Sequence, residues 1–298
     1  MLEKGFSLEK KYVLSKSGRK KYLLRITSIS NAGYPDVKNA IEEKNAEFLV
    51  IKRLSRLSSL IPKAHFFGLS EDERTCYMVL DYISGKDAED VLPSLSSDEQ
   101  YDLGFFAGEE LLKLHMLDAP SGILQWYDRY SQKYARKCAV FNEINISAKE
   151  FSLDRISRFI SANSNFMKCD RQSFLHDDYH PANLIVKDGK LSGIIDFNRY
   201  DWGDPVHDFV KTAYFSSAIS TPFSKGQIDG YNKGSPSCIF WKKYSLYAAM
   251  TVIPDIVWSC WYSDKTGSRA EVERMRERVK MVCQSHKWFE SEIPIWYD

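Results

Sequence analysis

One short segment, residues 174–197, carries far more polar chemistry than the sequence around it. It reads FLHDDYHPANLIVKDGKLSGIIDF, so two histidines, four aspartates and one asparagine stand among apolar or turn-forming residues. Histidines and carboxylates are common ligands of hydrolytic metal ions, which makes a metal cluster one interpretation. The other is phosphoryl transfer, in which one aspartate orients a hydroxyl group and an Asn/Asp pair holds magnesium.

The spacing within this segment favours phosphoryl transfer. A catalytic loop of the form H-x-D, followed five residues later by Asn, supplies a hydroxyl-orienting carboxylate and a magnesium ligand. His176, Asp178 and Asn183 have this spacing, and an Asp-Phe dipeptide begins thirteen residues after Asn183, at Asp196. The remaining histidines have no second ligand at a recognised spacing, so the sequence disfavours a metallohydrolase.

A β-hairpin is expected to bring the two predicted magnesium ligands together. The runs LIVK and KLSGIID are strand-like, and the Asp-Gly pair at residues 188–189 is a strong signal for a two-residue turn. If Lys187 faces Lys190 across this turn, Asn183 and Asp196 both lie at the open end of the hairpin.

The surrounding elements indicate an α+β protein with two lobes. Strand-like runs dominate the first eighty residues around one helical segment, whereas residues 95–117 show a helical pattern with Ser97 as the expected N-cap, and most of the later sequence is helical. We therefore predict a small β-rich N-lobe at residues 1–83, with a hinge at its end, and a larger, mainly helical C-lobe at residues 84–298.

Composition excludes several classes of protein. Hydrophobic residues make up 44% and charged residues 27% of the chain, and 41 basic residues balance 40 acidic ones, which argues against disorder and against nucleic acid as a partner.

The first residues lack the apolar core of a signal peptide, and the apolar stretch LYAAMTVIPDIVWSCWY is too short for a membrane span of ~20 residues. We interpret that stretch as a buried helix broken at Pro254. The six scattered cysteines favour reduced thiols. These features predict a cytoplasmic protein without a membrane partner.

Two motifs resemble those of the aminoglycoside phosphotransferase family. HDDYHPAN resembles the H-G-D-x-H-x-x-N motif of that family, and IDFNRYDWGDPVHD resembles its following I-D-F/W and G-D-P-x-x-D motif. The segments LLRI, AEFLVIKRL, YMVLDYISG and LGFFAGEELLKLH follow in the expected order, so the likeness covers nearly the whole chain. The resemblance implies a protein-kinase-like fold and a kinase that uses Mg²⁺ to transfer the γ-phosphoryl group of ATP or GTP to a small hydroxylated acceptor.

The resemblance also implies roles for residues of the polar segment. Asp178 takes the position of the catalytic base or hydroxyl-orienting group, and its nearest rival is Asp177, which stands where the family usually has glycine. His176 is expected to be a buried residue that supports the loop. Asn183 and Asp196 would coordinate magnesium.

On the nucleotide side, this sequence departs from the family at one position. Arg25 stands where the family has the lysine that binds the α- and β-phosphates, and Glu47 matches the helix glutamate that pairs with this cation. Glu43 is the alternative partner one turn earlier. If Arg25 only faces solvent, Lys10 or Lys11 becomes the expected phosphate contact.

Two further segments are expected to contact the nucleotide. The backbone groups of Asp81 and Ile83 in the hinge would face a purine, and residues 5–7, with the sequence Gly-Phe-Ser, could cover the phosphates. The hinge side chains do not distinguish ATP from GTP.

The acceptor is less well defined by the sequence. The family resemblance makes an aminoglycoside-type antibiotic the first candidate acceptor. A macrolide, choline, a sugar or an amino-acid alcohol are the alternatives. A cationic acceptor would need clustered carboxylates, for which Asp201, Asp255 and Asp264 are candidates. Asp204 and Asp208 are instead expected to cap a helix and to lie in its first turns. From a different class, the arginine in place of lysine leaves open a non-catalytic nucleotide-binding module.

Overall fold

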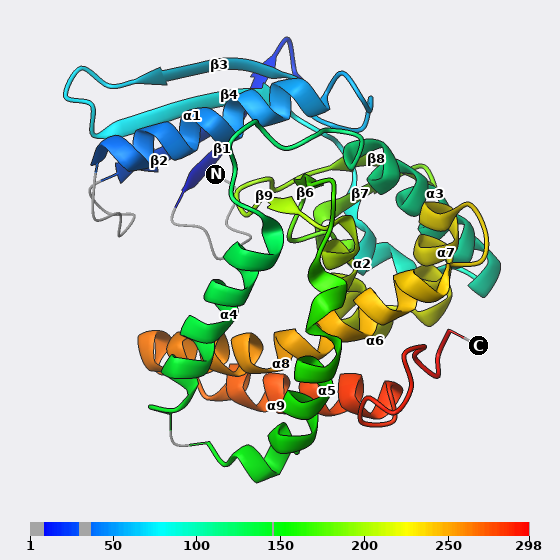
Figure 1. Cartoon of the computed structure of the whole chain (residues 1–298). Coiled ribbons are helices and arrows are strands. Elements are labelled where there is room, and N and C mark those ends of the chain that lie inside the picture. The colour runs from blue at the N-terminus through cyan, green and yellow to red at the C-terminus, as the bar shows by residue number, and fades with distance from the viewer. Residues whose placement is uncertain (1–8, 30–36, 145, 298) are drawn as a thin grey trace. The chain divides into compact units, whose positions relative to one another are not determined.

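The structure is a computed structural model that describes residues 9–29, 37–144 and 146–297. The first described residues alternate antiparallel strands with one long helix, and helices predominate from α3 onward (Figure 1). The predicted α+β class, with one β-rich and one mainly helical part, is confirmed.

The chain divides into two compact units. One unit comprises residues 1–91 with residues 182–200, and the other comprises residues 92–181 with residues 201–298. The polar segment at residues 174–197 therefore contributes to both units. The boundary after residue 83 between a nucleotide-binding lobe and a catalytic lobe stays a prediction.

A four-stranded antiparallel sheet forms the larger part of the first unit. The strand order is β1-β2-β4-β3, and α1 packs along β3 and β4 (Figure 1). In β4 every second side chain is buried, which is the alternation expected of a strand with one covered face. The elements of this layer are β1 (Lys10–Lys16), β2 (Arg19–Ser28), α1 (Val37–Leu54), β3 (Ala64–Leu69) and β4 (Thr75–Asp81).

A second, smaller sheet of the same unit contains the predicted hairpin. Lys187 pairs with Lys190, and Asp188 and Gly189 both adopt positive φ angles, of 51° and 74°. Two positive φ angles define a type I′ turn, which Asp-Gly favours. The predicted hairpin and its register are confirmed. The elements are β5 (Lys86–Asp87), α2 (Ala88–Val91), β7 (Leu184–Lys187) and β8 (Lys190–Ile194), in the sheet order β5-β7-β8.

The second unit is mainly helical, with a short two-stranded sheet. Helix α3 begins with a capping box in which Ser96 and Glu99 exchange hydrogen bonds, so the predicted N-cap at Ser97 is wrong by one residue. The glutamate was the deciding signal, because a capping box requires it three residues after the cap. The elements are α3 (Ser97–Leu114), α4 (Trp126–Phe141), α5 (Leu153–Asn163), β6 (Ser173–Leu175), β9 (Asp201–Gly203), α6 (Ser217–Ile219), α7 (Thr221–Asn232), α8 (Cys238–Thr266) and α9 (Ala270–Ser285).

Helices α3 and α7 pack with unusually little space between their backbones. Each carries two glycines four residues apart, Gly104 and Gly108 on α3 and Gly226 and Gly230 on α7. A Cβ atom at any of the four would overlap the backbone of the facing helix. The sequence analysis did not identify this contact, which positions the end of α3 beside the candidate site.

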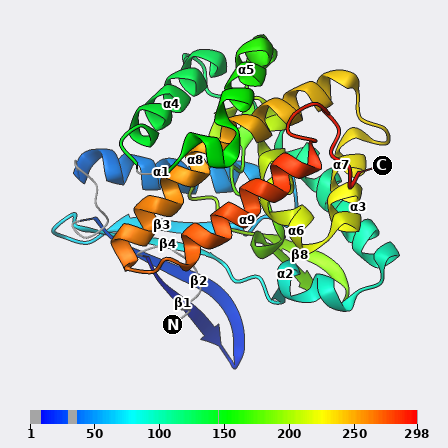
Figure 2. The same cartoon turned by 90° about the horizontal axis from the view of Figure 1, so that it is seen from below.

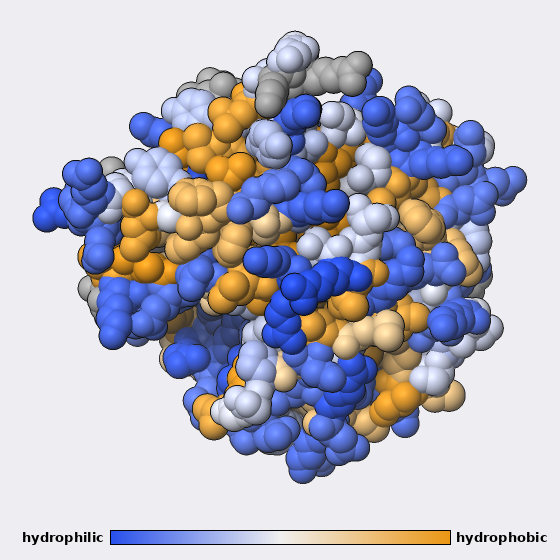
Figure 3. Space-filling model, turned by 90° about the horizontal axis from the view of Figure 1, so that it is seen from above, coloured by the Kyte–Doolittle hydropathy of each residue, from blue (hydrophilic) through white to orange (hydrophobic). Residues whose placement is uncertain are grey.

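Helix α8 continues through Pro254, so the predicted break there is wrong. The helix is 29 residues long and runs beside α9 (Figure 2). Among the described residues no helix is both long and apolar enough to cross a membrane. The face drawn in Figure 3 mixes hydrophilic residues with smaller apolar areas.

Candidate active site

The loop that follows β6 is held at its backbone by one buried carboxylate. The Asp208 side chain accepts hydrogen bonds from the backbone N–H of His176 at 2.8 Å and of Asp177 at 2.7 Å. His115 Nε2, at the end of α3, lies 2.9 Å from the same carboxylate. Burial raises the pKa of Asp208, but the His115 hydrogen bond and the other contacts outweigh it and hold this pKa below its ordinary value. Asp208 therefore stays charged and anchors the loop.

Asp208 has a larger role than the one predicted from sequence. It lies in a 3₁₀-helix, Pro205–Phe209, that Asp204 caps by accepting a hydrogen bond from the Val206 N–H, as predicted. The sequence analysis treated Asp208 only as a residue of this helix. The last aspartate of the G-D-P-x-x-D motif was the signal that could have indicated its contact with the loop.

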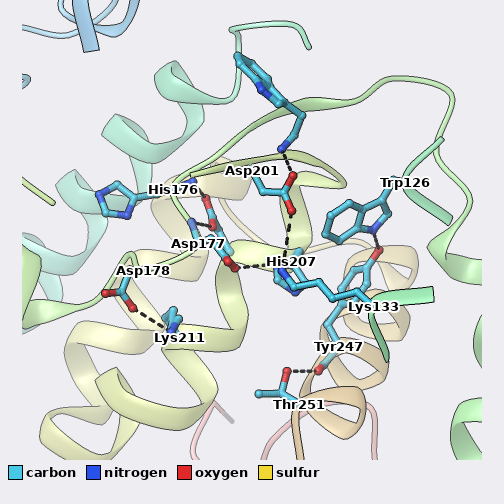
Figure 4. Close-up of polar contacts among 12 residues, drawn as sticks. Trp126, Lys133, His176, Asp177, Asp178, Asp201, His207, Lys211, Tyr247 and Thr251 are labelled. Atoms are coloured by element: carbon cyan, nitrogen blue, oxygen red, sulfur yellow. Dashed lines mark hydrogen bonds and ion pairs between the residues drawn. The ribbon is translucent and has the colours of Figure 1, made fainter. Parts of the chain in front are cut away.

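The neighbouring aspartates of the loop point in different directions (Figure 4). Asp177 has a φ angle of 56°, a left-handed conformation that glycine adopts most easily and Asp tolerates better than most residues. This conformation explains why a glycine suits the position. The Asp177 carboxylate lies 3.4 Å from His207 Nδ1, whereas Asp178 faces Lys211. His176 is fully buried, as predicted.

The Asp178 carboxylate lies beside one lysine and one histidine. Lys211 Nζ is 2.8 Å from Asp178 Oδ1, and His180 Nε2 is 3.5 Å from the same oxygen. Burial raises the pKa of Asp178, but the contacts with His180 and Lys211 outweigh it and place this pKa well below its ordinary value. The carboxylate is therefore anionic at neutral pH and can act only as a hydrogen-bond acceptor. Sequence reasoning missed Lys211.

The hairpin brings Asn183 and Asp196 to one end, as predicted. Leu184 pairs with Ile194, and beyond that pair the Ile195 N–H donates to the Asn183 carbonyl at 3.0 Å. Asp196 follows directly and has a φ angle of 68°, a strained value of the kind that concentrates at functional sites. An amide and a carboxylate oxygen are suitable ligands for Mg²⁺. The two residues therefore fit a magnesium site by position and by chemistry.

A cluster of metal-binding histidines and carboxylates is not supported. In the described part of the chain, no group of three or more His, Cys, Asp or Glu residues is placed to hold a metal ion. His176 and His180 instead contact aromatic rings, of Tyr179 and Phe215.

Arg25 lies in a buried network of ion pairs in the first unit. Its Nη1 donates to Glu47 at 2.6 Å, and its Nη2 lies 2.6 Å from Glu9. The expected pairing with Glu47 is present, and Arg25 is 5% exposed rather than facing solvent. Lys11 is opposite Arg25 on the neighbouring strand β1, next to Lys10.

Glu9 and Lys44 complete this network, and sequence reasoning missed both. Lys44 Nζ lies 2.6 Å from Glu9 and 3.2 Å from Glu47, one helical turn away on α1. Burial raises the pKa of Glu9, but Arg25 and Lys44 outweigh it and lower this pKa to about 2. Burial would lower the pKa of Arg25, yet Glu47 and Glu9 raise it above its ordinary value. Glu9 and Arg25 are thus both charged at neutral pH.

The hinge residues lie at the end of β4. The Asp81 N–H donates to the Lys63 carbonyl at 2.9 Å, and the Asp81 carboxylate lies 2.7 Å from His65 Nε2. Ile83 packs against Gly193 of β8 so closely that a Cβ atom there would overlap its side chain. Asp81 and Ile83 both line a pocket of about 360 Å³. Residues 5–7, the predicted phosphate-covering loop, lie outside the described residues.

The carboxylates suggested for a cationic acceptor are mostly paired with cations of the protein. Asp201 lies 3.0 Å from Arg129 Nη1, and both Asp255 oxygens accept hydrogen bonds from Arg278, at 2.9 and 2.7 Å. Asp264 is exposed. These three residues do not form a free acidic cluster.

Comparison with known proteins identifies the class of this protein as a kinase-type phosphotransferase. Residues 2–241 match the profile of the phosphotransferase enzyme family, abbreviated APH, so the chain belongs to this family. Its predicted class, a phosphotransferase with a hydroxyl group as acceptor, is confirmed. No curated protein matched the sequence.

Several solved structures share the fold at low sequence identity. The gentamicin complex of APH(2")-IIa is 17% identical, with a TM-score of 0.63 over 92% of this chain and 90% of that one. A thermostable mutant of aminoglycoside phosphotransferase APH(4)-Ia is 13% identical, with a TM-score of 0.67 over 96% and 94%. The GDP complex of aminoglycoside 2'-phosphotransferase-IIIa is 14% identical, with a TM-score of 0.64 over 94% and 91%. The predicted kinase-like two-lobe fold is confirmed.

Proposed function

We propose that this protein transfers the γ-phosphoryl group of ATP or GTP to a hydroxyl group of a small molecule, with an aminoglycoside-type antibiotic as the first acceptor to test. One observation carries the proposal. The hairpin joins Asn183 and Asp196 at its open end, and Asp178 stands five residues before Asn183 on a loop that Asp208 anchors. This combination supplies the groups that phosphoryl transfer requires.

In the proposed reaction, Asp178 accepts a hydrogen bond from the acceptor hydroxyl and so directs its oxygen toward the γ-phosphorus. A bond forms between these two atoms while the bond from the γ-phosphorus to the β,γ-bridging oxygen breaks. The nucleoside diphosphate leaves with the electron pair of the broken bond. The hydroxyl proton passes to the Asp178 carboxylate and then to water, so that the charges balance.

Asn183 and Asp196 are the proposed magnesium ligands. When bound, Mg²⁺ would neutralise negative charge on the phosphates. Arg25, held by Glu47, is the proposed partner of the α- and β-phosphates, and its planar guanidinium can bind a phosphate with two parallel hydrogen bonds. The hinge backbone near Asp81 and Ile83 is the proposed purine contact.

The similar structures support this choice of ligands by what they contain. They include complexes with GDP, with AMP-PNP together with hygromycin B, and with ATP together with streptomycin. A neutral hydroxylated acceptor, such as a sugar, is the second candidate. The pairing of Asp201 and Asp255 with arginines favours it, because these carboxylates then have less charge to offer an ammonium group.

A phosphotransfer screen tests the proposal. The purified protein is incubated with Mg²⁺, ATP or GTP and one acceptor at a time from aminoglycosides, macrolides, choline, neutral sugars and amino-acid alcohols. Nucleoside diphosphate and phosphorylated acceptor are measured by mass spectrometry. We expect equimolar diphosphate and phosphomonoester with at least one class. Nucleotide binding without a product from any acceptor would support a non-catalytic module instead.

A further inference from the structure

Lys211 occupies an unusual place beside the loop that carries Asp178. It directly precedes a π-helical turn, Thr212–Ser216, and it follows Asp208 by three residues. Residues three apart in a helical segment lie on the same side. One short segment therefore contacts the catalytic loop twice, with Asp208 at the loop backbone and Lys211 at the Asp178 side chain.

The π-helical turn also supplies an aromatic ring, that of Phe215, against which Lys211 and His180 both lie. Lys211 Nζ lies 5.1 Å from the centre of the Phe215 ring, and the His180 ring stacks on Phe215 with centres 5.3 Å apart. Lys211 and His180 both face Oδ1 of Asp178, at 2.8 and 3.5 Å. π-Helical turns are rare and often occur at functional sites. Phe215 thus orients two side chains toward the same carboxylate oxygen.

The ion pair between Lys211 and Asp178 is less exposed to solvent than an ordinary surface ion pair. The side chains of Lys211 and Asp178 are 16% and 17% exposed. Exposed ion pairs contribute little to stability, whereas the attraction within an ion pair shielded from water is stronger and holds both side chains in place. Burial raises the pKa of Asp178, but the hydrogen bond with His180 and the charge of Lys211 together keep it below its ordinary value.

We propose that Lys211 is a positioning residue for phosphoryl transfer, which holds the Asp178 carboxylate in the orientation that receives the acceptor hydroxyl. The proposal rests on the proposed function. The competing explanation is an ion pair that only stabilises the fold. The chain offers a matched control for that explanation, because Lys243 is also 16% exposed and lies 2.6 Å from the buried Asp204.

Lys211→Met is the first test, with kcat and KM measured for the acceptor and nucleotide that give transfer in the wild type. A positioning role predicts that kcat falls roughly 10- to 100-fold while the nucleotide KM stays near its wild-type value. Lys211→Arg should restore part of the rate because it keeps the charge. Lys243→Met should lower stability without this loss of kcat.

A second readout does not depend on turnover. The titration of the Asp178 carboxyl is followed by NMR of protein with ¹³C-labelled aspartate, assigned with Asp178→Asn. Removing a nearby cation favours the protonated carboxyl, so the Asp178 titration should move to higher pH in Lys211→Met and stay in place in Lys243→Met. An unchanged Asp178 titration, or a wild-type kcat in Lys211→Met, would overturn the positioning role. Absence of transfer by the wild type would instead count against the proposed function alone.

Discussion

Arg25 and Asp178 both take part in ion pairs, but the two groups of charges are built differently. Arg25, Lys44, Glu9 and Glu47 form a closed network in which each cation contacts both carboxylates, and all four side chains are at most about a tenth exposed. Asp178 is more exposed and contacts Lys211 and His180 through a single carboxylate oxygen.

The difference lies in what holds each group in place. The network around Arg25 is stabilised by its own four charges, so removing one member leaves buried charges without compensation. The loop of Asp178 is instead anchored through the backbone N–H groups of His176 and Asp177, which donate hydrogen bonds to Asp208. Changes near Arg25 should therefore affect both stability and nucleotide use, whereas changes at Asp178 should affect the chemistry while the loop backbone stays anchored.

The largest effect is expected for Asp178→Asn. The amide keeps the shape of the side chain but has no carboxylate to orient the hydroxyl group of the substrate and to receive its proton. We therefore expect kcat to fall by roughly 10²- to 10⁴-fold. Asp177→Asn should be far milder, because Asp177 points toward His207 and not toward Lys211. Steady-state kinetics of both variants provide the measurement. The reverse ranking would mean that Asp177 is the reactive aspartate.

Arg25→Ala should have the next largest effect. Losing a charge-assisted contact of this kind costs on the order of 1.5–3 kcal/mol, or roughly 10- to 100-fold in kcat/KM for the nucleotide. Arg25→Lys should recover part of this loss, because lysine keeps the positive charge but lacks the planar guanidinium whose Nη1 and Nη2 face Glu47 and Glu9. The free energy of unfolding should fall as well.

A control and a double mutant sharpen this prediction. Arg276→Ala breaks exposed ion pairs with Glu150 and Glu273 and should leave nucleotide kinetics unchanged. Glu47→Gln should impair the same kinetic parameter as Arg25→Ala, and the double mutant should be less than additive because the two residues act together. Normal nucleotide kinetics for Arg25→Ala would transfer the phosphate role to Lys10 or Lys11.

Asp196→Ala should weaken magnesium-dependent nucleotide binding by at least roughly ten-fold, since loss of a metal ligand should cost no less than loss of its supporting contacts. Isothermal titration calorimetry with and without Mg²⁺ gives the difference. Asp188→Asn is the matched control, because it removes a carboxylate from the other end of the same hairpin and asparagine suits the turn. Equal losses in both variants would point to damage of the hairpin rather than to a magnesium site.

The smallest expected effect concerns acid stability. The pKa of Glu9 is about 2 in the folded chain against an ordinary value of 4.5. Because the folded state lowers this pKa, Glu9 stabilises the fold above about pH 4.5 and loses that contribution as pH falls toward 2. In Glu9→Gln, the free energy of unfolding should therefore depend less steeply on pH in this range. Glu42→Gln, at an exposed position of α1, should retain the wild-type slope.

Local patterns predicted the parts of the site that depend on neighbouring residues in sequence. The Asp-Gly turn signal was sufficient to place Asn183 and Asp196 at one end of the hairpin, because a two-residue turn determines the register of both strands. The cap at Asp204 followed from the Asp-Pro pair in the same way. The motif order was sufficient for the family and the fold.

Contacts between distant segments could not be read from such patterns. Lys211 and Lys44 are single cations in unremarkable sequence, and only folding brings them beside Asp178 and Glu9. The close approach of α3 and α7 depends on glycines that are more than a hundred residues apart. The break predicted at Pro254 failed because the surrounding residues of α8 are buried and packing maintained the helix through the proline.

The most direct test of the central claim measures two properties of Asp178→Asn side by side. Nucleotide affinity is measured by calorimetry in Mg²⁺, and transfer of the γ-phosphoryl group is measured in a single turnover with an acceptor that the wild type uses. If the Arg25 network and the hairpin bind the nucleotide while Asp178 serves the chemistry, affinity should stay within about two-fold of wild type and transfer should be lost. A variant that loses affinity and transfer together, or one that still transfers the phosphoryl group at the wild-type rate, would contradict this division of roles.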